Sequence, residues 1–249
     1  MSLVALPGYQ SLVLLDKSKH RSLGVRPDAA RFAASLHTIH LTLAEFIPAS
    51  RHFPIVFAKD VSGRVHAFAV VGAEPGHNLA TDTHGDWRPE VYCPAYVRRY
   101  PFWTTEVQDH GTTKSMICVD VAGLTDTPPH LFDAQGEPTP RWREIQHLVE
   151  EIDAAQAHTL TFCRELERRA LLEPFAADLN PQQGPRRRIE GMLRVREDAL
   201  RQLPPVQLVE FAQNGYLPRI YAHLMSHDNF HRLLQVSAES TGTSPTVCG

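Results

Sequence analysis

The chain has only four cysteines in 249 residues, and no two of them form a Cys-x-x-Cys pair. A disulfide framework or a zinc site built from cysteines is therefore not expected. Cys118 lies in an apolar run and is expected to be an unreactive core residue, whereas Cys248 is expected to be an exposed thiol. The sequence also lacks a nucleotide-binding glycine loop and a Gly-x-Ser-x-Gly elbow. These absences exclude the most easily recognised nucleotide-binding and hydrolase classes, although not enzymes in general.

Long apolar runs are missing as well. No segment approaches the roughly 18 uninterrupted apolar residues of a transmembrane helix. The first residues lack the cationic region and apolar core of a signal peptide, so we expect no membrane insertion and a cytoplasmic location. The net charge of −3 gives no overall attraction to nucleic acid. The cluster Arg186–Arg188 is interpreted as an exposed loop, and nucleic-acid binding is not expected.

The first 140 residues predict a mixed portion of short strands, helices and loops. A helical pattern covers residues 32–51. Strand-like runs at 53–58 and 66–72 flank the turn Ser62-Gly63 and predict an antiparallel hairpin. A further strand is expected over 114–120.

Residues 141–238 predict a helical portion, followed by a disordered tail over 239–249. The expected helices are 141–173, 197–202, 205–214, which Gly215 ends in the left-handed conformation, and 218–236. Because strands and helices do not alternate along the chain, the sequence favours an α+β fold over a doubly wound sheet. A small mixed or antiparallel sheet would pack against the C-terminal helices, and both portions could form one compact domain.

The most unusual segment covers residues 85–103, which we call the signature segment. It is denser in aromatic residues, prolines and arginines than the chain as a whole, which is 8% aromatic. Pro94 is well suited to begin a helical turn, and Pro101 is expected to end that turn. Residues spaced by four share a helix face, and the signature segment has three tyrosines with this spacing: Tyr92, Tyr96 and Tyr100.

Two interpretations of the signature segment remain open. It is either a structural plug of buried rings or a ligand platform of rings and guanidinium groups. In the platform interpretation Asn78 lies at the rim, and the ligand-binding residues are Trp87, Tyr92, Tyr96, Arg98, Arg99, Tyr100 and Trp103. Neighbouring helix residues project about 100° apart. One of the two adjacent arginines is therefore expected to pair internally, and the other to bind a carboxylate or phosphate.

Histidines supply the candidate chemistry. His223, His227 and His231 are four residues apart and could hold a Zn or Fe ion along one helix face, although no His-Glu-x-x-His frame is present. The other interpretation is a helix that happens to be rich in histidine. His40 and Glu45 are expected to form a buried structural pair rather than a catalytic one.

The signature segment and several others together resemble the SapC family of bacterial proteins, which is named for surface-layer (S-layer) loci. The other segments are 32–34, 40–46, 53–57, 117–120, 131–138 and 221–226. In the family an apolar residue usually stands where His227 is found, so a metal site there would not be shared by the family. The resemblance implies an accessory protein of surface-layer or envelope-polymer systems.

The expected function is therefore binding of a protein or glycan partner, without a cofactor and with a homo-oligomer as a possibility. The alternative is a metal-assisted enzyme that uses the histidine-rich helix and holds an anionic substrate with Arg98 or Arg99. A non-enzyme is favoured, because the sequence offers no convincing catalytic constellation.

Overall fold

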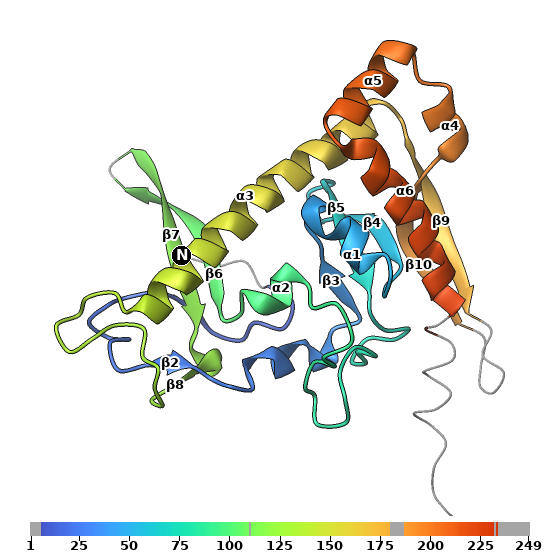
Figure 1. The fold of residues 1–249 in the computed structure, drawn as a ribbon. Coiled ribbons are helices and arrows are strands. Elements are labelled where there is room, and N and C mark those ends of the chain that lie inside the picture. The colour runs from blue at the N-terminus through green and yellow to red at the C-terminus, as the bar shows by residue number, and fades with distance from the viewer. Residues whose placement is uncertain (1–5, 110, 180–186, 232, 234–249) are drawn as a thin grey trace, which may run out of the picture.

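The computed structural model describes residues 6–109, 111–179, 187–231 and 233 (Figure 1). Its centre is a five-stranded antiparallel sheet in the order β3-β5-β4-β10-β9. These strands are β3 Thr38–His40, β4 Ile55–Lys59, β5 Val65–Val70, β9 Leu172–Leu179 and β10 Arg187–Val195. The hairpin β4–β5 confirms the strands expected on either side of Ser62-Gly63.

Two smaller sheets complete the strand content. The first has the order β1-β7-β6, with β1 Leu12–Leu14, β6 Phe102–Asp109 and β7 Thr112–Asp120. The second joins β2 Gly24–Val25 to β8 Leu124–Thr125. Strand β7 confirms the strand expected over 114–120. Since every paired strand is antiparallel and long helices are present, the fold is α+β, as the sequence predicts.

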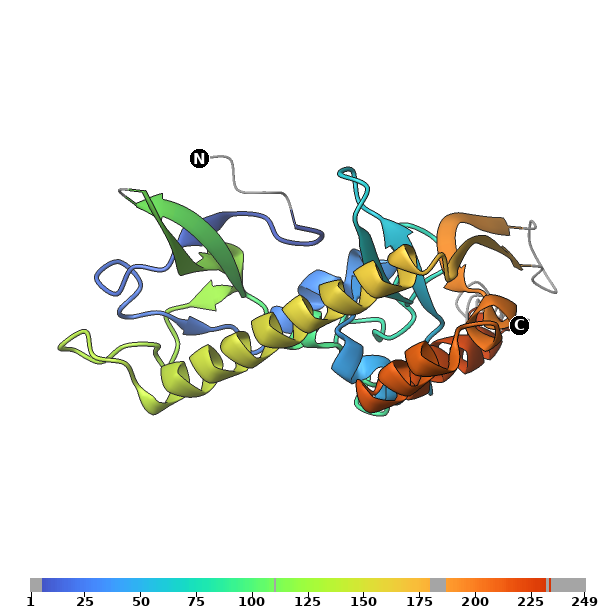
Figure 2. The same ribbon diagram turned by 90° about the horizontal axis from the view of Figure 1, so that it is seen from above.

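Helix α3, Pro140–Arg168, runs lengthwise from the β6–β7 end of the molecule to the β9–β10 end (Figure 2). The C-terminal helices follow: α4 Glu197–Arg201, α5 Pro205–Gln213 and α6 Tyr216–Ser226. Gly215 has the expected left-handed conformation, with φ of 69°. The last expected helix is interrupted: a 3₁₀ turn at His227–Asn229 follows α6, and Phe230, His231 and Leu233 are helical again. The tail predicted over 239–249 and Cys248 lie outside the described residues.

The helix expected over residues 32–51 is wrong. The segment contains a 3₁₀ helix Ala29–Ser35, strand β3, a 3₁₀ turn Leu43–Glu45 and the short helix α1 Phe46–Ala49. The buried side chains Ile39, Leu41 and Leu43 recur every second residue, which is the period of a strand. Strand β3 then pairs with β5 at the edge of the central sheet.

The C-terminal end of the long helix was also placed wrongly. The expected helix extends to residue 173, but α3 ends at Arg168 and Ala170 turns the chain with φ of 51°. The N–H of Leu171 donates to the carbonyl of Leu166, and the N–H of Ala170 donates to that of Glu167. This is a Schellman motif with alanine where glycine is usual, which is why the sequence gives no stop signal there.

Strands β9 and β10 were missed by the sequence interpretation. Residues Arg187 and Arg188 begin β10 instead of forming a loop, while Arg186 lies outside the described residues. The portion after residue 140 is therefore not purely helical. It contributes two strands to the sheet whose other three strands come from the first portion.

The main core runs through both portions of the chain. It joins Phe46 and Phe57 to Phe162 of α3 and Ile220 of α6. A second core packs β6 and β7 against the first turns of α3, around Phe102, Val119 and Trp142. Among the described residues, no helix is both long and apolar enough to cross a membrane.

Candidate functional site

The signature segment folds as the proline pattern predicts. Pro94 is the N-cap of the short helix α2, Ala95–Arg98, and Tyr96 and Tyr100 are buried behind it. Their rings pack with two rings from the N-terminal part of the chain. The Phe32 and Tyr100 rings are stacked with centroids 4.0 Å apart, and Tyr9 meets Tyr100 edge-on at 5.0 Å.

The tyrosine hydroxyls of this cluster are used internally. Tyr96 donates to the carbonyl of Pro7 at 2.7 Å, and Tyr100 donates to the Asp120 carboxylate at 3.3 Å. Burial raises the pKa of both phenols above the ordinary value, so both remain protonated donors at neutral pH. These two rings are therefore parts of the core rather than an open ligand surface.

Tyr92 donates its hydroxyl to Glu45. The buried Glu45 carboxylate accepts hydrogen bonds from the Tyr92 hydroxyl at 3.1 Å and from the Ala95 N–H at 2.6 Å. It also accepts from the backbone N–H of Thr42 at 2.8 Å. Glu45 thus caps two short helices at once. The expected His40–Glu45 pair is not formed, since the His40 ring packs on Phe68 at 4.4 Å instead.

The two adjacent arginines have different environments. Arg99 is buried, and its guanidinium pairs with Asp153 of α3 at 2.9 Å and lies 4.3 Å over the Trp103 ring. Arg98 is exposed and lies beside the hydroxyl of Tyr92. Arg99 therefore anchors the signature segment to α3, and Arg98 keeps its charged group at the surface.

The remaining platform residues also hold the chain in place. Trp87 donates its indole N–H to the carbonyl of Val91 at 3.1 Å. The buried Asn78 amide donates to the carbonyl of Ala33 and accepts from the N–H of Ala80, both at 2.9 Å. Of the eight residues considered for the platform, Arg98 alone is exposed. This arrangement favours the structural plug.

Two histidines at the C-terminal end of α6 direct a ring nitrogen at the same backbone oxygen, the carbonyl of Ile55, which lies 3.2 Å from His227 Nε2. His223 is fully buried, and its Nδ1 donates to the carbonyl of Ile55 at 2.8 Å while its Nε2 accepts from the N–H of Val195 at 3.1 Å. Burial, followed by the neighbouring His227, lowers the pKa of His223 well below the ordinary value, so the ring is neutral. The His227 ring stacks on Phe175 with centroids 5.0 Å apart, and His231 is exposed.

Both ring nitrogens of His223 are therefore occupied by the backbone, which leaves no lone pair for a metal ion. In the described ranges, no group of three His, Cys, Asp or Glu side chains is arranged to hold a metal ion. The proposed role of the three histidines in binding Zn or Fe thus gains no support from their geometry.

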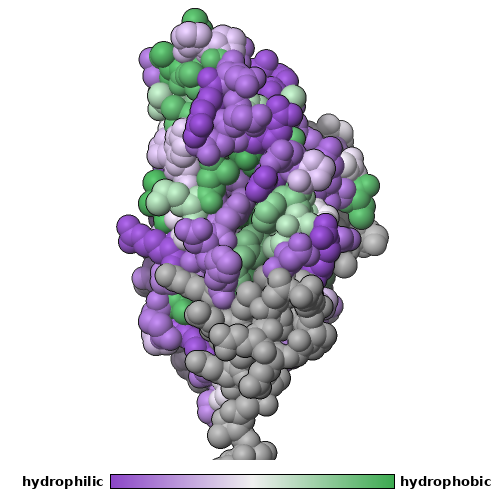
Figure 3. All heavy atoms as spheres, turned by 90° about the vertical axis from the view of Figure 1, so that its right-hand side faces the viewer, coloured by the Kyte–Doolittle hydropathy of each residue, from purple (hydrophilic) through white to green (hydrophobic). Residues whose placement is uncertain are grey.

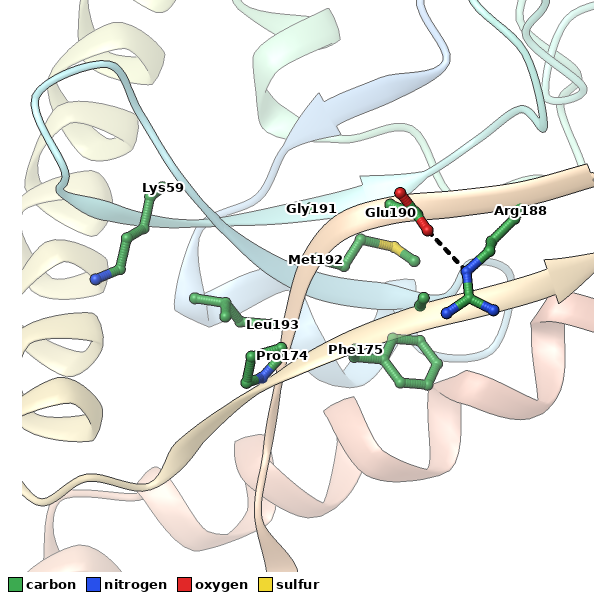
Figure 4. A pocket seen from close by; sticks show the side chains of 9 residues that line it. Lys59, Pro174, Phe175, Arg188, Glu190, Gly191, Met192 and Leu193 are labelled. Atoms are coloured by element: carbon green, nitrogen blue, oxygen red, sulfur yellow. Dashed lines mark hydrogen bonds and ion pairs between the residues drawn. The ribbon is translucent and has the colours of Figure 1, made fainter.

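A hollow surface lies instead beside β10, where no site is predicted from the sequence. Two adjoining cavities of about 480 and 330 Å³ share the lining residues Arg188, Glu190, Gly191 and Met192. We call them together the β10 groove. The first cavity is completed by Lys59 and by β9 residues including Phe175 and Ala176 (Figure 4). The second extends over the sheet, to Val56, Ala58, Phe68, Val70 and Ala73.

The backbone of β10 produces this hollow. Its ladder with β9 shifts register between Ile189 and Met192, and Gly191 has a φ of 78° that favours glycine. The ladder between β10 and β4 consists of one residue pair, Leu193 with Phe57. Over Arg187–Met192, β10 therefore has a strand partner on one side only.

Charges at the mouth of the groove are balanced. Arg188 pairs with Glu190 at 2.8 Å and with Asp178 at 3.1 Å, and Lys59 pairs with Glu167 at 3.2 Å. Between these pairs lie Met192 and Phe175 (Figure 4). On the side of the molecule that carries β9, β10 and α6, hydrophobic surface lies between bands of hydrophilic side chains (Figure 3). The groove thus offers an apolar surface to a ligand, and its balanced charges produce no strong electrostatic field of either sign.

The sequence carried a weak signal for this site. Over Arg188–Gly191, charged residues alternate with an apolar residue and a glycine, and the apolar residues Met192, Leu193 and Val195 follow, which is compatible with a strand. The signal was missed because Pro185 and the arginine cluster indicated a loop, and because residues 169–173 were assigned to a helix.

A comparison with protein-family models matches residues 15–233 to the family described as SapC. Neither the curated proteins nor the solved structures contain a match.

Proposed function

The chain belongs to the SapC family, and from this premise we propose that it is a binding protein, an accessory of bacterial surface-layer or envelope-polymer systems. Its partner is a protein, of which an extended apolar segment occupies the β10 groove. The family name supports the link to the surface layer, and the groove supports binding.

The observation that carries this proposal is the apolar, charge-balanced lining of the groove. Binding sites for protein segments are largely apolar at their centre, with polar groups at the rim. Val56, Val70 and Met192 are aliphatic, and the nearby arginine and lysine already have carboxylate partners. A glycan would need many hydrogen-bonding groups for its hydroxyls, whereas the polar side chains of this lining are His37 and Thr38 and the ion-paired Lys59, Arg188 and Glu190. The lining therefore favours a protein partner over a glycan.

The backbone of β10 supports an extended partner. Peptides often add a strand to a sheet edge, where unpaired N–H and C=O groups supply affinity and side-chain pockets supply specificity. Strand β10 has one free side over Arg187–Met192, directly beside the groove. A segment lying there would place alternate side chains toward Phe68 and Phe175.

Selection from a displayed library of short peptides tests this proposal, with a glycan array as the parallel arm. The expected result is enrichment of apolar, extended peptides that bind the full chain. Ala176→Glu and Ala73→Glu place a charge in the two cavities and should weaken the selected peptides by roughly tenfold or more.

Val206→Glu is the matched control, because Val206 lies on α5 with 79% of its surface exposed and is expected to keep full binding. Peptides that bind all three variants equally would overturn the assignment of the groove. Binding of glycans without any peptide would overturn the choice of a protein partner.

A further inference from the structure

A second cavity, separate from the β10 groove, lies between α2 and the first half of α3. It has a volume of about 190 Å³, which is space for about six water molecules at the density of the liquid. We call it the α2–α3 cleft. Apolar side chains line it, including Val25, Phe102, Ile145 and Val149. Charged side chains line it too: Arg98, Arg99, Arg141 and Glu144.

We propose that this cleft binds a small carboxylate that carries a short aliphatic chain. The carboxylate lies between Arg98 and Arg141, and the chain lies on the apolar lining. The inference is independent of the proposed binding of a protein segment, because the two sites share no lining residue.

The charged side chains that line the cleft carry a net positive charge. Arg99 is already neutralised by Asp153 at 2.9 Å. Arg141 meets Glu144 through one contact of 3.3 Å between two exposed side chains, and such a surface pair contributes little free energy. No carboxylate in the described part of the chain lies within ion-pair distance of Arg98. An anion would therefore meet one guanidinium that has the Tyr92 hydroxyl but no carboxylate as its partner, and one that is weakly paired.

The shape of the donors favours an oxyanion. A guanidinium presents a planar fork of N–H groups that matches a carboxylate or phosphate with two hydrogen bonds. Arg98 comes from the end of α2 and Arg141 from the start of α3, so they approach the cleft from different elements. Their exposed positions leave both free to adjust to the ligand.

The apolar lining of the cleft favours an anion with an apolar chain over a simple anion as the ligand. Phe102, Ile145 and Val149 are all buried and form continuous core beneath the charged mouth. Phosphate or acetate would contact the arginines alone. The chain of a longer carboxylate would also contact the apolar lining, and each methylene that is fully removed from water strengthens binding roughly fourfold.

Titration calorimetry of the full chain in chloride buffer tests the proposal, with acetate, butanoate, hexanoate and inorganic phosphate as probes. The expected order is hexanoate, then butanoate, then acetate, with phosphate no tighter than acetate. Arg98→Gln and Arg141→Gln should each weaken hexanoate about tenfold. Arg143→Gln is the matched control, since Arg143 is an exposed residue of α3 that does not line the cleft.

Arg98 also lies beside the Tyr92 hydroxyl that donates to Glu45, so each variant is checked by thermal unfolding. Leu148→Phe provides a test that leaves the charges intact, because it fills the cleft from α3. It should weaken hexanoate more than acetate.

Three results would overturn the proposal. One is that none of the probes binds with saturation. Another is that phosphate or acetate binds as tightly as hexanoate. The last is that Arg98→Gln and Arg141→Gln, while still folded, bind hexanoate like Arg143→Gln.

Discussion

Side chains of α6 take the place of a strand partner at the start of β4. The N–H of Ile55 donates to the Ser226 hydroxyl at 2.8 Å, and the carbonyl of Ile55 accepts from His223. The other nitrogen of His223 holds the N–H of Val195 in β10. The buried His223 ring therefore hydrogen-bonds a backbone group of β4 and one of β10 at a point where the ladder between these two strands does not continue. Without it, both buried backbone groups would lose this partner, which costs free energy.

His223 also shows the limit of reading single residues from a sequence. Spacing identifies residues that share a helix face, but it does not tell whether that face meets solvent, a ligand or a strand. Spacing suggested a metal ligand at position 223, yet the imidazole is equally suited to bridge a carbonyl and an N–H group. Only the position of β10, which the sequence interpretation missed, decides between the two uses.

Ala170 is the residue at which a single substitution should stabilise the chain. An alanine in the left-handed region is strained, whereas glycine is not. Ala170→Gly should raise the free energy of unfolding by about 0.5–1 kcal/mol, measured by denaturant titration. Ala157→Gly, at an exposed position inside α3, should lower it by a similar amount. Destabilisation by both variants would contradict the Schellman motif at the end of α3.

At the level of secondary-structure elements, those that could be predicted have a local sequence signal. The hairpin β4–β5 and the short helix α2 depend on a turn and a proline that lie within the element itself. The hairpin β9–β10 depends on a helix end without glycine and on a bulge at Gly191. The helix end has no standard sequence signal, and a glycine indicates a bulge only once the strand around it is recognised. The sheet's last two strands, and with them the β10 groove, were therefore missed.

The signature segment is joined to α3 through one charged pair. Arg99 is 3% exposed at the side chain, and Asp153 is its carboxylate partner. Asp153→Asn would leave a buried guanidinium without a counter-charge, which should lower the free energy of unfolding by about 2 kcal/mol.

Glu150→Gln on the exposed side of α3 is the control and should change the stability by less than about 0.5 kcal/mol. Equal denaturant midpoints for the two variants would show that Arg99 does not anchor the segment. Glu150→Gln should also leave hexanoate binding in the α2–α3 cleft within about twofold of the wild type, since Glu150 neither lines the cleft nor pairs with an arginine that lines it.

For the whole molecule, the shared sheet makes the two portions of the chain depend on each other. Strands β3, β4 and β5 precede residue 140, but the rings of Phe46 and Phe57 lie 6.0 and 6.2 Å from Phe162 of α3. The start of β4 is bonded to α6. A fragment of residues 1–139 would expose this core on one face and lose the strands that follow β4 in the sheet.

We therefore expect the fragment 1–139 to lack a cooperative unfolding transition, and the full chain to unfold in one transition. Circular dichroism against temperature and the dispersion of amide NMR signals measure both. A fragment with dispersed signals and its own sharp transition would mean that the first portion is an independent domain. In that case the β10 groove would be an interface between two domains, and a peptide in it would change their association rather than the stability of one folded unit.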